Sequence, residues 1–70
     1  MTTTTHITSV RPGREDKDAW IVTDTQGITY HTRNQWKASL AQRAMETDAE
    51  VVITHFAGWY YRDLEKIVLT

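Results

Sequence analysis

Three histidines, His6, His31 and His55, are the residues of this 70-residue chain best suited by type to bind a metal ion. Three imidazoles around an open fourth position are typical of catalytic zinc. These three lie on separate predicted strands, none has the short spacing of a ligand pair, and the chain contains no cysteine. The pattern therefore favours ordinary polar strand positions, and we expect neither a metal site nor another cofactor.

Covalent catalysis needs a hydroxyl or thiol activated by a neighbouring base, and the sequence offers no recognisable arrangement of this kind. The serines lie outside any glycine-rich loop or nucleophile elbow, and there is no phosphate-binding loop of the Walker type. Asp24 and Asp63 lie at predicted turns, where aspartate usually accepts hydrogen bonds from the local backbone. We therefore expect a non-enzymatic protein that acts by binding.

Aromatic and basic side chains offer a stronger candidate chemistry. Single-stranded nucleic acid binds by stacking its bases on exposed aromatic rings beside a basic groove. Adjacent residues of a strand point to opposite faces, so at least one ring of Trp59-Tyr60-Tyr61 should leave the core. Such a ring with a polar rim would also suit a protein interface or an inhibitor. The candidate residues for either kind of binding are Trp20, Arg33, Trp59, Tyr60, Tyr61, Arg62 and Lys66.

Charge and hydropathy limit the function further. Eight basic and nine acidic residues give a formal net charge of −1, so the chain lacks the excess that binds duplex DNA through phosphates alone. Binding to a single strand should be weak and largely independent of sequence. No apolar run approaches the ~20 residues of a membrane span, and the start does not resemble a secretory signal. We expect a cytoplasmic protein with no membrane contact.

A chain of this length forms at most one domain. Twelve threonines, which are β-branched, favour strands. We expect residues 1–5 to be a disordered tail and residues 6–70 to form a single domain. Apolar alternation and turn residues predict strands at 6–10, 19–23, 28–32, 51–56 and 59–62.

One amphipathic helix is predicted after the third strand. The segment Thr32-Arg33-Asn34-Gln35 fits a capping box, with Asn34 as an alternative cap. Trp36, Leu40 and Ala44 recur every four residues and form an apolar stripe. This spacing favours Trp36 as a core residue over Trp36 as an interface anchor.

The predicted order of three strands, one helix and two strands resembles that of the OB-fold, a small five-stranded barrel. The sequence is similar to OB-like small domains of phage and bacterial proteins, in which an aromatic strand, an Asp-x-x-Gly turn, a strand, a helix and an aromatic hairpin follow one another. The matching segments are 20–30 and 51–61, within a resemblance that spans 7–69. It implies a closed barrel that binds single-stranded nucleic acid or a protein partner.

Two alternatives remain open at the level of the sheet. An open antiparallel sheet could carry the helix across one face, and a free strand edge could support a homodimer. A small cysteine-free barrel needs most of its aromatic rings in the core, each contributing ~1.5–3 kcal/mol when fully buried. The expected core positions are Ile7, Val10, Ile21 or its neighbours Trp20 and Val22, Ile28, Tyr30, Trp36, Leu40, Val51, Ile53 and Ile67.

Overall fold

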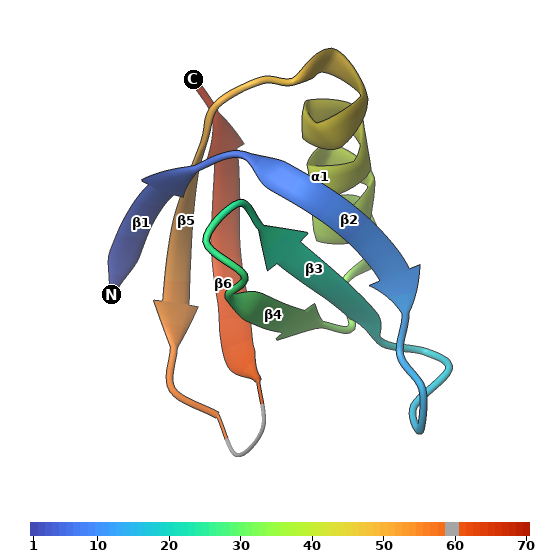
Figure 1. The fold of residues 1–70 in the computed structure, drawn as a ribbon. Coiled ribbons are helices and arrows are strands. Elements are labelled where there is room, and N and C mark those ends of the chain that lie inside the picture. The colour runs from blue at the N-terminus through green and yellow to red at the C-terminus, as the bar shows by residue number, and fades with distance from the viewer. Residues whose placement is uncertain (59–60) are drawn as a thin grey trace.

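The computed structural model of the chain describes residues 1–58 and 61–70. Within these ranges the chain forms six strands and one helix (Figure 1). The strands join in one sheet in the order β1-β5-β6-β4-β3-β2, and every neighbouring pair is antiparallel except β4 and β6. The elements are β1 Thr2–Thr5, β2 Ile7–Pro12, β3 Trp20–Asp24, β4 Thr29–Thr32, α1 Gln35–Thr47, β5 Val51–Phe56 and β6 Arg62–Leu69.

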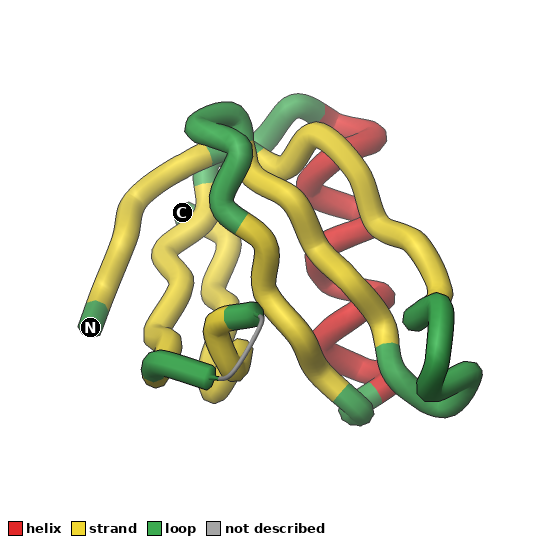
Figure 2. Tube along the Cα trace, turned by 60° about the horizontal axis from the view of Figure 1, so that its bottom comes forward, coloured by secondary structure: helices red, strands yellow, loops and turns green. Residues whose placement is uncertain are grey.

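The sheet curves around the core but is not closed, so the prediction of a closed five-stranded barrel is wrong (Figures 1 and 2). Its two edge strands, β1 and β2, follow each other in the chain with a bend at His6. Two segments joined in this way at a single residue cannot turn back to pair with each other. The coarser prediction of a mainly β domain with one helix is confirmed. The parallel β4–β6 pair also makes the sheet mixed, unlike the open antiparallel alternative.

The threonine run at the start of the chain, which we expected to be disordered, forms β1. It pairs antiparallel with β5, with Thr2 opposite Thr54 and Thr5 opposite Val51. Threonine is β-branched and suits a half-exposed strand. The partner strand lies far away in the sequence, so a local reading of the run gives no sign of the pairing.

The hairpin of β3 and β4 is confirmed, and its turn is held by Asp24. One carboxylate oxygen of Asp24 accepts hydrogen bonds from the backbone amides of Gln26 at 2.9 Å and Ile28 at 3.0 Å. Gly27 takes a φ of 82°, a left-handed conformation that favours glycine. The turn therefore depends on an aspartate and a glycine three positions apart.

Helix α1 begins after Asn34, the alternative cap. Its side-chain oxygen accepts hydrogen bonds from the backbone amides of Trp36 at 2.9 Å and Lys37 at 3.3 Å. The Thr32 hydroxyl in turn accepts a hydrogen bond from the Asn34 amide at 3.1 Å. The helix ends at Asp48, whose left-handed backbone lets its amide reach the last helical carbonyls.

The buried face of α1 is formed by Ala38, Ala41 and Ala44. Trp36 is 75% exposed, so its prediction as a core residue is wrong. The helix is rotated so that its small residues face the sheet, which lets the backbone approach the strands closely. Leu40 packs only at the margin of the core. No helix in the described part of the chain is long and apolar enough to cross a membrane.

The core lies between α1 and the concave face of the sheet (Figure 2). Burial confirms most of the expected positions, while Val10 and Ile28 pack only partly against this cluster. Ala41 and Ala44, which lie on the predicted apolar stripe of the helix, also belong to the cluster, as does Leu64, which was not among the expected core positions. The buried cluster consists of Ile7, Val22, Tyr30, Ala41, Ala44, Val51, Ile53, Leu64 and Ile67.

Candidate functional site

The face of the sheet opposite α1, called here the outer face, carries the candidate site. Side chains alternate along a strand, so Val22 and Tyr30 enter the core while their neighbours in sequence point outward. The strand registers align five residues across β2, β3, β4, β6 and β5. This transverse row consists of Arg11, Ile21, His31, Asp63 and Phe56.

Tyr61 and His31 stack at the centre of the outer face. Their ring centroids lie 6.3 Å apart and their planes are inclined by only 14°. The parallel pairing of β4 with β6 places Asp63 opposite His31 and so brings Tyr61, just before β6, over the imidazole. The Tyr61 side chain is exposed, with 40% of the residue's surface open to solvent. It therefore presents an exposed aromatic surface beside a second, nearly parallel ring.

Two adjoining hollows lie beside this stack, and both are lined by Arg14, Ile21 and Tyr61. The first encloses about 430 Å³ and is completed by Arg11, Pro12 and Thr29. Sites for small ligands typically enclose about 300–1,000 Å³. The hollow thus has an apolar floor at Ile21, an aromatic side at Tyr61 and a basic side at the arginines.

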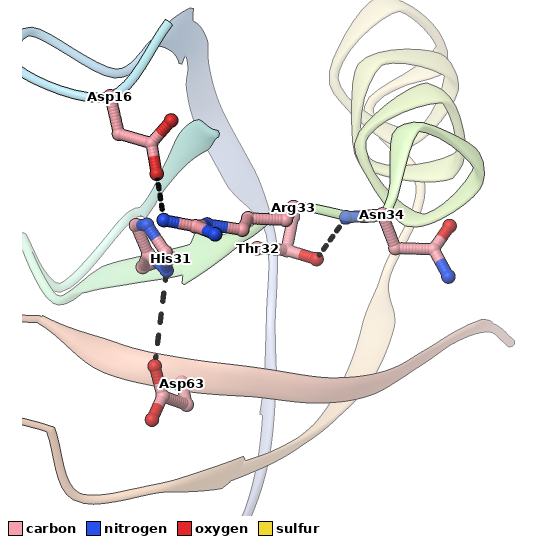
Figure 3. A network of polar contacts seen from close by, with 6 residues as sticks. All are labelled: Asp16, His31, Thr32, Arg33, Asn34 and Asp63. Atoms are coloured by element: carbon pink, nitrogen blue, oxygen red, sulfur yellow. Dashed lines mark hydrogen bonds and ion pairs between the residues drawn. The ribbon is translucent and has the colours of Figure 1, made fainter. Parts of the chain in front are cut away.

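The loop between β2 and β3 forms the wall that carries Arg14. The Gly13 amide donates to the Ala19 carbonyl at 2.8 Å, and the Ala19 amide donates to the Asp16 carbonyl at 3.1 Å. A Cβ atom at position 13 would clash with the Asp16 carbonyl oxygen, so the loop requires glycine there. The Asp16 carboxylate also pairs with Arg33, which ties the loop to the segment before α1 (Figure 3).

Charges are distributed unevenly along the row. Arg11 and Arg14 are exposed, and within 1–58 and 61–70 neither forms an ion pair. The Asp63 carboxylate at the other end of the site lies 3.9 Å from His31 Nδ1 (Figure 3). That distance is too long for a hydrogen bond, and none of the described residues donates a hydrogen bond to this carboxylate. Two unpaired arginines therefore lie near β2, with Glu15 beside Arg14 in the lining of the second hollow, and a negative charge lies at β6.

Two of the predicted site residues belong to this region. Tyr61 is at its centre, and Arg33 lies at its margin, held by Asp16. Trp20 is half-buried on the opposite face, where it lines a separate groove between α1 and the strands β2 and β3.

The remaining predicted site residues are not gathered here. Arg62 is half-buried, with Nη1 3.8 Å from the Met1 sulfur. Lys66 is exposed and lies opposite Thr54, farther along β6. Trp59 and Tyr60 lie outside the described residues.

His31 and Asp63 are site residues that the sequence reading missed. The sequence suggests His31 only as a metal ligand, and it suggests Asp63 as a turn residue or as part of the polar rim of a protein interface. The alternation within 28–32 does predict that His31 and Tyr30 point to opposite faces of the sheet. This is the one sign in the sequence that His31 lies on the outer face. Its partner on β6 could not be found, because nothing local in the sequence indicates a parallel β4–β6 pair.

The three histidines are not brought together. His31 lies on the outer face, whereas His55 is 2% exposed in the core. Among the residues with described positions, no group of three histidine, cysteine, aspartate or glutamate side chains could hold a metal ion. Burial lowers the pKa of His55 below its ordinary value of 6.5, and the nearby positive charge of Arg62 lowers it further.

Comparison with protein-family models, with curated proteins and with solved structures finds no match for this chain. The likeness to OB-like domains therefore stays a prediction.

Proposed function

We propose that this protein is a non-catalytic domain that binds single-stranded nucleic acid on the outer face. The observation that carries the proposal is the exposed Tyr61 ring, nearly parallel to that of His31, beside two arginines that form no ion pair with the described residues. A base would stack on Tyr61, and the phosphates would pass Arg11 and Arg14. The apolar floor at Ile21 would exclude water from beneath the base.

The expected affinity is modest. One base stacked on an aromatic side chain contributes about 1–3 kcal/mol, whatever the base. Two arginines can neutralise only about two phosphates, and the net charge of −1 adds no long-range attraction. Binding should therefore be clearest at low ionic strength and should favour single strands, whose bases are free to stack.

The test is a titration of a labelled single-stranded oligonucleotide of about ten nucleotides that contains all four bases, followed by fluorescence anisotropy at low salt. Tyr61→Ala should weaken binding about five- to a hundredfold, the loss expected for one stacked base. Trp36→Ala is the matched control, because it removes an exposed aromatic ring from the helix and should leave the affinity unchanged. Absence of binding at low salt, or equal losses in both variants, would overturn the proposal.

Protein recognition is the second candidate function, and the free edge of β1 favours it. β1 is an edge strand, and its four threonines carry no charge that would block pairing with another strand. A second copy could add its own β1 edge to edge and form a homodimer. Sedimentation velocity should then show association that rises with concentration and is lost in Thr4→Lys. A monomer at all concentrations would exclude this homodimer.

A further inference from the structure

Asp63 carries a negative charge on a surface that we propose binds phosphates, which a carboxylate repels. It lies in the transverse row between two aromatic rings, with His31 on β4 and Phe56 on β5 directly opposite it. Its side chain is 63% exposed, and its carboxylate lies 3.9 Å from Nδ1 of the His31 imidazole. A carboxylate here repels a phosphate, so it can contribute only by accepting hydrogen bonds from another part of the ligand.

The basic and acidic residues of the transverse row lie apart from each other, so a ligand that contacts both would bind in one orientation. Neighbouring strands lie about 4.8 Å apart, so the backbone of Asp63 is about 14 Å from that of Arg11, three strands away. Phosphates favour the end of the row with Arg11 and Arg14, which leaves the bases directed towards β6. Phe56, which is 53% exposed, adds a second aromatic surface beyond Asp63.

We propose that Asp63 gives the site a preference for guanine. This inference rests on the proposed function. The Watson–Crick edge of guanine carries two adjacent donors, N1–H and the N2 amino group, which match the two oxygens of one carboxylate. Adenine and cytosine offer one amino group each. Thymine and uracil offer a single N–H between two carbonyl oxygens, which repel a carboxylate.

The test compares four labelled oligonucleotides of equal length at one low salt concentration. Guanine, adenine or cytosine alternates with thymine in three of them, and the fourth contains thymine alone. The wild-type protein should bind the guanine probe about five- to a hundredfold more tightly than the thymine probe, the discrimination expected of one bidentate contact. The adenine and cytosine probes should lie between them.

Asp63→Asn should abolish this order, because an amide has one acceptor and one donor group and cannot accept both guanine protons. Glu65→Gln is the matched control, since it removes an equal charge from the same strand at an exposed position outside the row. It should strengthen binding of all four probes alike and preserve their order.

The outcomes separate the two proposals. If the wild-type protein binds no probe, the proposed function fails and the guanine preference fails with it. If all four probes bind equally, or if Asp63→Asn keeps the wild-type order, the guanine preference is overturned while nucleic-acid binding stands.

Discussion

Tyr30, Asp24 and His55 form a polar cluster inside an otherwise apolar core. The Tyr30 hydroxyl donates to Asp24 Oδ2 at 2.9 Å, and the ring meets that of His55 edge to face at a centroid distance of 5.2 Å. His55 Nε2 lies 2.9 Å from the Thr3 hydroxyl, while Nδ1 has no hydrogen-bond partner among the described residues. The protonation of Tyr30 and of His55 is therefore coupled to folding.

Tyr30 should make the protein sensitive to alkali. Burial, followed by the hydrogen bond to Asp24, raises the pKa of Tyr30 from 10.0 to about 12. The folded state holds this proton more tightly, so the stabilisation is complete below pH 10.0 and is lost as the pH rises towards 12. Absorbance titration of the phenolates should show one group with a midpoint near 12 that is absent in Tyr30→Phe.

The same substitution tests the hydrogen bond at neutral pH. Tyr30→Phe should lower the free energy of unfolding by about 1–3 kcal/mol, because it leaves a buried carboxylate oxygen without its donor. Urea denaturation measures this change, and a variant as stable as the wild type would contradict it.

His55 should make the protein sensitive to acid. Its pKa is lowered in the folded state, so the unfolded chain binds the proton more readily. The stabilisation is therefore complete above pH 6.5 and decreases as the pH falls towards the lowered pKa. Urea denaturation at about pH 7.5 and 5.5 should show the decrease in the wild type. His6→Gln should retain it and His55→Gln should lose it; the reverse pattern would contradict the assignment.

The first turn of α1 depends on one cap. Asn34→Ala removes the acceptor of two backbone hydrogen bonds and should lower the free energy of unfolding by about 1 kcal/mol. Ser39→Ala, an exposed position in the middle of the helix, should change it by less than about 0.5 kcal/mol. Thermal unfolding followed by circular dichroism measures both, and equal effects would count against a capping role.

Elements defined by local chemistry were predictable from the sequence. The β3–β4 hairpin follows from a turn that begins with Asp24 and ends with Gly27, and the start of α1 follows from Asn34. The prediction of Trp36 as a core residue, made from the apolar stripe of the helix, is wrong for a physical reason. Spacing indicates that a helix has an apolar side, but close approach to the sheet selected the alanines and left Trp36 in solvent.

Elements defined by distant partners were not predictable. β1 forms a strand because it pairs with β5. Tyr61 lies beside His31 because β6 pairs in parallel with β4. Of the aromatic residues of the site, the sequence identifies Tyr61 as a binding residue. Its partners on β2, β4 and β6 required the registers of three strand pairs.

The affinity for a single strand should depend only weakly on salt, because the nearly neutral molecule has few basic residues to contact phosphates. If Arg11 and Arg14 contact two phosphates, the logarithm of the affinity should fall with the logarithm of the salt concentration with a slope of about −1.4. Replacing both arginines with glutamine should flatten this slope. Arg43→Gln, on the exposed side of α1, should leave it unchanged. A steep slope in the double variant would place the phosphates elsewhere.

The parallel pairing of β4 with β6 also determines when the candidate site comes into existence during folding. β2, β3 and β4 pair with their neighbours in the chain, and α1 needs only local hydrogen bonds. β6 reaches β4 only after a long segment has been closed into a loop, and such contacts form late. We therefore expect Tyr61 to meet His31 only after the β3–β4 hairpin and α1 have formed. A chain that stalls before β6 pairs with β4 would lack the site, so ligand binding would report that this pairing has formed.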